Sequence, residues 1–248
     1  MEAMTAALAA GRRVLPRGYA HLALQLAIWL GFYAAYQVAR GWADRDVGAA
    51  FAHGRWIIDF QRGAGGLFEV SLQKFVEQSS LLIQATSYTY WLSQFAVVAI
   101  ALLWVYVRSH DNFYGFRNTL IVANLIGLVG YVFVPTAPPR MFPEFGFQDT
   151  LAAHAAVDHS SGLVAFSSNP YAAMPSLHAT DALIVGVAMA LLVRPRWAKA
   201  LWLAWPAWVW FSVMATGNHF WLDIAAGVAV AGLAAALVLR GRVRSLWA

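Results

Sequence analysis

Six long apolar runs, separated by polar segments, dominate the pattern of hydrophobic and polar positions along the chain. A helix needs about 20 apolar residues to cross a hydrocarbon core about 30 Å thick, so runs near this length predict membrane spans. The predicted spans cover residues 21–38, 81–107, 118–134, 175–193, 201–215 and 222–239. The pattern therefore predicts an all-α, polytopic integral membrane protein with six transmembrane helices.

Two segments, residues 41–79 and 136–174, are too polar to span a membrane. The first has apolar residues at partly helical spacing and a glycine break at 63–66, which predicts short interfacial helices. An ordinary packed loop outside the membrane is the alternative. The second segment is predicted to be a structureless loop, and loops this long are often functional. These boundaries predict two parts, residues 1–80 (N-terminal tail, first span and interfacial helices) and residues 81–248 (a membrane domain that carries the candidate chemistry).

Composition supports the membrane class. Of the 248 residues, 60% are hydrophobic and 12% are charged, whereas soluble domains carry about 25% charged residues. The chain contains no cysteine, which excludes disulfides, thiol chemistry and thiolate metal sites. Its net charge of +5 does not indicate a nucleic-acid partner, because basic residues in membrane proteins usually mark cytoplasmic loops.

The basic residues also predict an orientation. With the N-terminus in the cytoplasm, eleven of the 17 lysines and arginines fall in cytoplasmic segments, although the outer segments are much longer. The eleven are Arg12, Arg13, Arg17, Arg108, Arg117, Arg194, Arg196, Lys199, Arg240, Arg242 and Arg244. We therefore expect a plasma-membrane protein with both termini in the cytoplasm. Arg140, His178, His219 and Asp223 then gather at the outer ends of spans three to six, in one site that faces out of the cell.

Candidate chemistry begins where the fourth span starts. Pro175 suits the first turn of a helix and Ser176 can cap free backbone N–H groups, which places His178 in that first turn. A helix N-terminus offers N–H donors and a partial positive charge, which suits a phosphate group. Asp181, one turn further on, is expected to tune His178 or to hydrogen-bond a neighbouring helix.

A second histidine stands at the start of the sixth span. His219 and Asp223 are four residues apart, so in a helix they share a face and the carboxylate can orient the imidazole. His154 and His159 resemble a metal pair, but their loop offers no further ligands at suitable spacing. The sequence therefore predicts no metal site and no cofactor.

Three motifs carry a family resemblance. Pro175-Ser176-Leu177-His178 and His219-x-x-x-Asp223 look like two signatures of the type-2 phosphatidic acid phosphatase superfamily, and Pro138-Pro139-Arg140 sits where its first, basic signature belongs. Two segments, residues 137–140 and 169–178, most resemble its inositol phosphorylceramide synthase-like branch. This branch is common in actinobacteria. The resemblance covers roughly residues 80–240. It implies a phosphatidic acid phosphatase-like helical core.

This sequence departs from the family pattern at several positions. Phe133 stands where the broad family has a lysine, and Met141 follows Arg140 in place of a proline. Val213 follows Ser212 where the family has an arginine, so two usual cations are absent. Leu177 replaces the usual glycine, as it does in the synthase-like branch. The histidine pair is intact, whereas the phosphate-binding set is altered.

The resemblance implies a metal-independent lipid phosphatase or phosphotransferase that works through a phosphohistidine. His219 would attack phosphorus, Asp223 would hold its imidazole and His178 would protonate the leaving oxygen. The implied phosphate-binding residues are Arg140, Ser176, Leu177 and Asn218, and the supporting residues behind them are Asp181, Asn169 and Tyr171.

Three functions fit these residues. The first is transfer of a phospho-head group, such as inositol phosphate, from a membrane phospholipid to an acceptor lipid. The second is a plain phosphatase of phosphatidate or polyprenyl phosphate, with water as the acceptor. The third is a transporter that relays protons, which predicts polar residues along several spans; here they gather at one end. The sequence sets no oligomeric state.

Overall fold

The structure is a computed structural model that describes residues 15–43, 46–154 and 170–244. All regular secondary structure in these ranges is helical, which confirms the all-α part of the prediction. The helices are α2 (Gly18–Ala43), α3 (Val47–Gly63), α4 (Glu69–Glu77), α5 (Ser80–Leu92), α6 (Val98–Arg108), α7 (His110–Phe133), α8 (Thr150–His154), α10 (Leu177–Leu192), α11 (Arg196–Ala215) and α12 (Trp221–Arg244). A π-helical segment, η1 (Ser93–Val97), joins α5 to α6.

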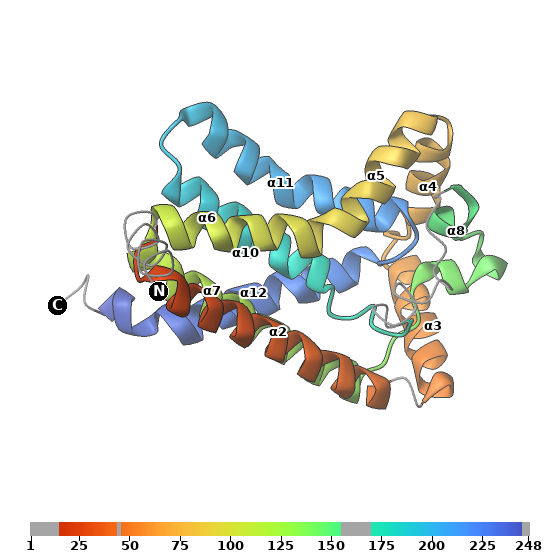
Figure 1. The fold of residues 1–248 in the computed structure, drawn as a ribbon. Helices are drawn as coiled ribbons and strands as arrows, with labels where there is room; N and C mark the ends of the chain where they lie inside the picture. Colours follow the sequence, from red (N-terminus) through yellow and green to blue (C-terminus); the bar gives the residue numbers. More distant parts are fainter. Residues whose placement is uncertain (1–14, 44–45, 155–169, 245–248) are drawn as a thin grey trace.

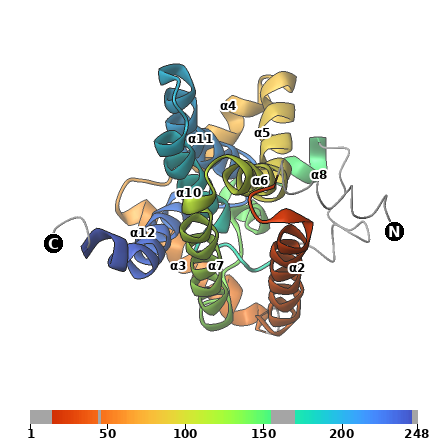
Figure 2. The same cartoon turned by 60° about the vertical axis from the view of Figure 1, so that its left-hand side comes forward.

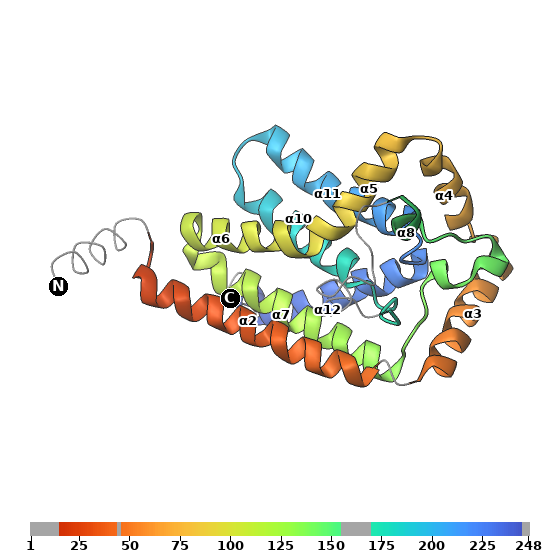
Figure 3. The same ribbon diagram turned by 45° about the vertical axis from the view of Figure 1, so that its right-hand side comes forward.

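The long helices form a bundle with α3, α4 and α8 at one end (Figure 1). Helix α10 lies inside the bundle, where it contacts α6, α7, α11 and α12 (Figure 2). Helix α2 begins and α12 ends at the end away from α3, α4 and α8 (Figures 1 and 3). The two ends of the bundle therefore differ: short helices cover one, and the first and last long helices start and finish at the other.

Among the described residues, three helical stretches are long and apolar enough to cross a membrane, which indicates an integral membrane protein. They are Ser80–Arg108, His110–Phe133 and Trp221–Arg240. Helix α10 is apolar but only 16 residues long. Helices α2 and α11 form where the first and fifth spans were predicted, but length and composition do not qualify them among the described residues. A count of six spans stays a prediction.

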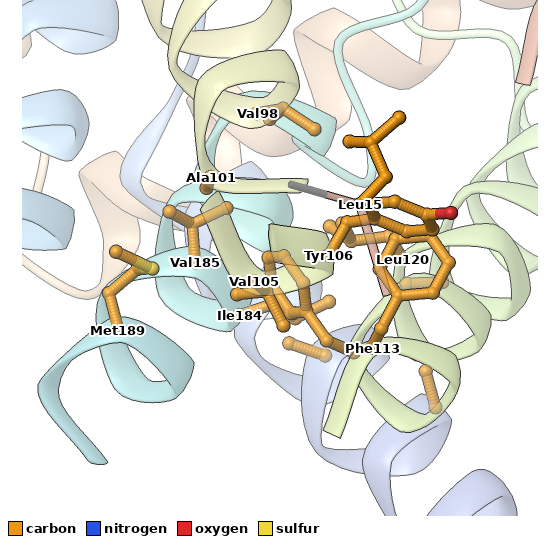
Figure 4. Close-up of a cluster of buried hydrophobic side chains, with 14 residues drawn as sticks. Leu15, Val98, Ala101, Val105, Tyr106, Phe113, Leu120, Ile184, Val185 and Met189 are labelled. Carbon is orange, nitrogen blue, oxygen red and sulfur yellow. The ribbon is translucent and has the colours of Figure 1, made fainter. Parts of the chain in front are cut away.

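The largest apolar cluster joins α6, α7, α10 and α12 (Figure 4). Val105 of α6 and Val185 of α10 are fully buried there, as is Leu120 of α7. Lipid tails are as apolar as these side chains, so close packing stabilises such contacts more than expulsion of water does. A small residue permits similarly close packing of α10 on α11: Gly186 leaves no room for a side chain against the Trp202 carbonyl and Pro206.

Several predicted boundaries are wrong at the ends of the spans. The polar turn expected at residues 108–117 is helical from His110, and the basic turn expected around residues 194–199 gives way to α11 at Arg196. Helix α10 begins at Leu177, so Pro175 precedes the capping residue instead of lying in the first turn. In the first two cases the apolar run marks only the membrane-embedded part of a helix, which continues into the adjoining polar residues. In the third, Ser176 has an extended backbone and caps the helix, so Pro175 lies outside it.

The two polar segments contain more helix than an ordinary loop. Residues 41–79 form the end of α2 and helices α3 and α4, with a break between Gly63 and Glu69 where Gly65 has φ +67°, a region that favours glycine. Residues 136–174 are not structureless, because they contain two 3₁₀ turns (Pro139–Met141 and Pro143–Phe145) and α8. The expectation of short helices in residues 41–79 is confirmed, and the expectation of a structureless loop in residues 136–174 is wrong.

The close contact between α10 and α11 gives a stability prediction. A methyl group at Gly186 would lie 2.6 Å from the Trp202 carbonyl oxygen, a backbone atom that cannot move aside cheaply. We expect Gly186→Ala to destabilise the protein by about 1–3 kcal/mol, the usual cost of overpacking. Thermal unfolding of the detergent-solubilised protein, followed by size-exclusion chromatography, measures this change.

The matched control is Gly232→Ala on α12, where nothing lies within 4 Å of the added methyl group. Alanine is a better helix former than glycine, so this variant should keep or slightly raise the unfolding temperature. Equal unfolding temperatures for the two variants would contradict the packing of α10 on α11.

Candidate active site

His178 lies in the first turn of α10. Ser176 caps this helix, as predicted, with its Oγ accepting a hydrogen bond from the Ala179 N–H at 3.3 Å. The imidazole stacks on the Tyr90 ring of α5, with 4.5 Å between ring centroids and 21° between planes. The cap sets where His178 leaves the backbone, and the tyrosine restricts how its ring turns.

His219 lies in the turn between α11 and α12. The Val213 carbonyl accepts hydrogen bonds from the N–H groups of both Asn218 and His219 at 3.0 and 3.1 Å. Gly217 precedes them with φ +71°, where an added side chain would also strike the Gln148 carbonyl. This tight turn directs the His219 ring into the protein, where the residue is 4% exposed.

A backbone carbonyl fixes the tautomer of His219. Its Nδ1 lies 2.9 Å from the Ala173 carbonyl oxygen and 3.4 Å from Asp223 Oδ2. A carbonyl can only accept, so Nδ1 carries the hydrogen and donates it to Ala173. Nε2 then keeps its lone pair, as a nucleophile requires.

The segment before α10 positions that carbonyl. The Thr136 N–H donates to the Tyr171 carbonyl at 2.8 Å, and the Ala173 N–H donates to the Thr136 carbonyl at 3.2 Å. Tyr171, a predicted supporting residue, contributes through this backbone pairing and through ring contact with Phe51. Asn169, another of that set, lies outside the described residues.

The two histidines come from different elements yet face each other. Their ring centroids are 5.8 Å apart, with 59° between the planes. The Ser176 N–H donates to the Asp223 carbonyl at 3.0 Å, and Thr180 Oγ1 donates to the Gly227 carbonyl at 3.0 Å. These bonds tie the start of α10 to the start of α12 and thereby set the separation of the histidines.

Asp223 is fully buried beside His219. Its Oδ2 accepts a hydrogen bond from the Phe220 N–H at 2.8 Å, as an acidic residue in the first turn of a helix often does. Its Oδ1 makes no hydrogen bond within the described part of the chain. The carboxyl group therefore serves the helix start and also lies within reach of the imidazole, whose closer partner is Ala173.

Arg140 reaches the same place from the loop after α7. Its Nη1 donates to Asn218 Oδ1 at 2.5 Å, and its Nε lies 3.6 Å from Asp149 Oδ2. Asn218 in turn donates from Nδ2 to the Thr216 hydroxyl at 2.8 Å. Asn218 therefore orients the guanidinium next to His219. Burial lowers the pKa of His219 to about 3, and the nearby Arg140 charge acts in the same direction.

Other predicted site residues have partners within the fold. The Leu177 side chain is buried against Tyr131, whose hydroxyl donates to the Pro175 carbonyl at 2.9 Å. Asp181 lies one turn beyond His178 and accepts a hydrogen bond from Asn124 of α7 at 2.8 Å. This bond fits the expectation that Asp181 hydrogen-bonds a neighbouring helix.

The structure also places the residues that depart from the family pattern. Val213 is fully buried in an apolar cluster with Val209 and Ala179, and Phe133 is 76% exposed at the end of α7. Neither position brings a cation to the histidines. The described residues contain no group of three His, Asp or Glu side chains able to hold a metal ion, and His159 lies outside them.

Three contacts of the site were missed by sequence reasoning. Tyr90 belongs to no chemical motif of the sequence, and the Ala173 carbonyl is a backbone atom without any sequence signal. Glu69 of α4 is the third: it is fully buried and accepts the Trp221 N–H at 2.9 Å, at the start of α12. Burial raises the pKa of Glu69. An acidic residue in a mixed polar segment gave no sign of this role.

Comparison with known proteins adds two findings. A family model described as the PAP2 superfamily matches residues 55–237. A curated phosphoinositol dihydroceramide synthase from Bacteroides thetaiotaomicron is 27% identical over 147 residues, which cover 54% of this chain and 48% of the relative. The match thus spans about half the length of that relative. No solved structure matches the chain significantly.

Proposed function

This chain belongs to the PAP2 superfamily, and on that premise we propose that it is a membrane-embedded phosphotransferase that moves the phospho-head group of a phospholipid to an acceptor lipid. The observation that carries the proposal is the facing pair of imidazoles, 5.8 Å between centroids, with Nδ1 of His219 occupied by a carbonyl. One phosphoryl group can contact both rings at this separation. The buried His219 has the lone pair on Nε2 that attack on phosphorus needs.

The first half of the proposed reaction forms a phosphohistidine. His219 Nε2 attacks phosphorus, and the bond between phosphorus and the oxygen of the departing diacylglycerol breaks. His178 donates its proton to that oxygen. The Ala173 carbonyl and the Asp223 carboxyl group lie at Nδ1, where they stabilise the positive charge that develops on the imidazole.

The second half releases the phosphoryl group to the acceptor. His178, now neutral, takes the proton of the acceptor hydroxyl, whose oxygen attacks phosphorus. The N–P bond breaks, and His219 regains its lone pair. Positioned proton transfer of this kind is typically worth about 10²–10⁴-fold in rate. Neither half of the proposed reaction uses a metal ion or a cofactor.

Arg140 is the proposed main phosphate-binding cation. Its guanidinium is oriented by Asn218 beside His219, and its Nε lies 3.6 Å from Asp149 Oδ2. The valine and phenylalanine at the two altered family positions bring no charge, so Arg140 carries more of the phosphate binding here. The first-turn N–H groups of α10 and Ser176 are proposed to assist it, while Asn218 acts by positioning Arg140.

The proposed donor and acceptor follow the similar synthase. That protein is named for joining a phosphoinositol group to dihydroceramide. We therefore propose an inositol phospholipid as the donor and a long-chain N-acyl amino alcohol as the acceptor, consistent with the synthase-like branch of the family.

The orientation is also a proposal. The excess of basic residues in segments on one side of the predicted spans supports cytoplasmic termini, six spans and a site at the outer face of the plasma membrane. The arrangement of the bundle supports termini on one side of the membrane, because α2 begins and α12 ends at the end away from α3, α4 and α8 (Figure 3).

A transfer assay tests the function. Membranes that contain the protein are incubated with inositol-labelled phosphatidylinositol and an N-acyl amino alcohol, with diacylglycerol, or without an acceptor. We expect a new labelled lipid only with the N-acyl amino alcohol, and none from membranes with His219→Ala. In a parallel incubation with phosphate-labelled phosphatidate, release of phosphate and diacylglycerol, with no new inositol-labelled lipid under any condition, would show a plain phosphatase instead. Loss of wild-type activity on metal chelation would contradict the metal-free steps.

The two histidines should fail in different ways. His219→Ala should abolish turnover together with any acid-labile phosphoenzyme. His178→Ala should slow phosphoenzyme formation about 10²–10⁴-fold from lipid substrates, but much less from nitrophenyl phosphate, whose leaving group needs little protonation. Trapped phosphoenzyme is measured over substrates of graded leaving-group pKa. A phosphoenzyme that persists in His219→Ala, or a His178→Ala defect that ignores the leaving group, would reverse the assignments.

Arg140→Ala should lower turnover about 10- to 100-fold, because a hydrogen bond to a charged group contributes about 1.5–3 kcal/mol. Its effect should be at least as large as that of Ser176→Ala. Arg62→Ala is the matched control, since Arg62 is an exposed arginine whose guanidinium lies over the Phe145 ring. Near-normal turnover in Arg140→Ala, with a large loss in Arg62→Ala, would contradict the proposed role of Arg140 and assign phosphate binding to Arg62 instead.

Single cysteines can test the orientation cleanly, because the chain has none of its own. Glu144→Cys replaces an exposed residue that lies 3.9 Å from Arg55 of α3, and Arg196→Cys replaces the exposed first residue of α11. In intact cells a membrane-impermeant maleimide should label Glu144→Cys, and Arg196→Cys only after permeabilisation. Labelling of both before permeabilisation would sink the proposed topology.

A further inference from the structure

A cavity of about 290 Å³ lies between α2, η1, α7 and α10. Asp181, one helical turn after His178, is among the residues that line it. Leu30 of α2 and Phe95 of η1 line it and are 65% and 45% exposed, so the cavity reaches the apolar surface between these two elements. The proposed mechanism uses none of the residues that line it. Its volume is near the lower limit of typical small-molecule sites, enough for part of a lipid while the remainder stays in the bilayer.

A polar cluster forms the inner wall of this cavity. Asn124 Nδ2 donates to Asp181 Oδ1 at 2.8 Å, and the Gln94 side chain is a further hydrogen-bond partner of Asp181. Asp181 and Asn124 are 4% and 7% exposed. Polar and ionisable groups inside membrane helices are costly and usually functional. If this cluster only held the helices together, its hydrogen bonds would be sufficient. Such a structural role does not explain the adjoining cavity.

The π-helical turn is the second unusual feature. Gln94 and Phe95 both belong to η1, where the helix from Ser80 to Arg108 widens for five residues. Such single-turn π-bulges occur frequently at functional sites, because they re-aim side chains that a regular helix would direct elsewhere. Here the turn brings one amide and one aromatic ring to the cavity.

The cavity lies one helical turn from the proposed reaction centre. Asp181 follows His178 by three residues on α10, a rise of about 4.5 Å along the same helix face. Tyr36 lines the cavity and also packs against the cluster of Tyr131 and Leu177, next to His178. When the reacting hydroxyl group of a lipid lies at His178, the neighbouring polar groups of that lipid therefore lie level with Asp181, Asn124 and Gln94.

The chemistry of the lining selects the kind of lipid. The described residues that line the cavity include no lysine or arginine, and Asp181 is an acidic group. An anionic phospholipid head group is disfavoured there, whereas a neutral lipid is not. A carboxyl oxygen and two side-chain amides satisfy a lipid that offers both N–H and O–H donors, while diacylglycerol offers ester oxygens and a single hydroxyl.

We propose that this cavity is the acceptor-lipid site, in which Asp181, Asn124 and Gln94 hydrogen-bond the amide and second hydroxyl of an N-acyl amino alcohol. Its acyl chain leaves between Leu30 and Phe95. The proposal rests on the proposed function, because it names the residues that choose the acceptor for the same reaction centre.

Photolabelling tests the site without turnover. The probe is an N-acyl amino alcohol with a diazirine in its acyl chain, added to the wild-type protein in detergent and located by peptide mass spectrometry. We expect labelling on Trp29–Tyr36 of α2 and on η1, with competition by unlabelled N-acyl amino alcohol but not by phosphatidylinositol. Labelling elsewhere would overturn the site, and competition by phosphatidylinositol alone would make it a donor site.

A matched pair of variants tests selection. In Gln94→Leu, transfer to the N-acyl amino alcohol should fall about tenfold relative to nitrophenyl phosphate hydrolysis by the same variant, and photolabelling should weaken. The control is Gln84→Leu, an exposed glutamine of α5 outside the cavity, for which neither quantity should change. An unchanged ratio in Gln94→Leu would contradict the assignment.

The two proposals fail separately. If the wild-type protein transfers no head group but the competed labelling of α2 and η1 remains, the proposed function is wrong and the lipid site stands. If transfer occurs and the label lies elsewhere, the proposed function stands and the acceptor site is wrong.

Discussion

The hydrogen bond from the Ser176 N–H to the Asp223 carbonyl is the contact on which the arrangement of the site depends. It joins the first turns of α10 and α12, two helices that start at the same end of the bundle. Gly227 makes the approach feasible, because an added methyl group there would lie 2.6 Å from the Ser176 carbonyl oxygen. Each helix carries or adjoins one histidine, so this junction sets the 5.8 Å between the imidazoles.

The short helices outside the long bundle support that junction. Glu69 of α4 accepts the Trp221 N–H at the start of α12, and Gln73 donates to the Gln148 carbonyl at 2.9 Å in the loop after Arg140. The predicted division of the chain at residue 80 stays a prediction, but these contacts cross it. The family match, which begins at residue 55, crosses it as well. Helix α4 therefore helps to hold the start of α12 and the loop after Arg140 in place.

Loss of the usual cations changes how charge is distributed around the histidines. A buried valine at position 213 fills space in an apolar cluster, while its carbonyl oxygen forms the turn that carries His219. Val213 thus forms the turn through its backbone carbonyl but has no charged side chain. Arg140 remains, held by Asn218, and hydrogen bonds from a charged donor are stronger than those between neutral groups.

The sequence by itself determined the helical class and the positions of the long helices. The apolar runs, the serine cap of α10 and the four-residue spacing of His219 and Asp223 are local properties, set by chain periodicity and by neighbouring residues. They also identified both histidines and Arg140 as a group. Helix ends were less accurate, because hydrophobicity marks the membrane and not the end of hydrogen bonding.

Only the tertiary structure decided which atoms meet those residues. The partner of His219 Nδ1 is the Ala173 carbonyl, and every residue has a carbonyl, so no side-chain pattern could single it out. Tyr90 and Glu69 reach the site from helices far away in the sequence, and Gln94 reaches the cavity through a π turn. Such contacts depend on how helices cross and rotate against one another, which packing in three dimensions sets and residue spacing along one chain does not.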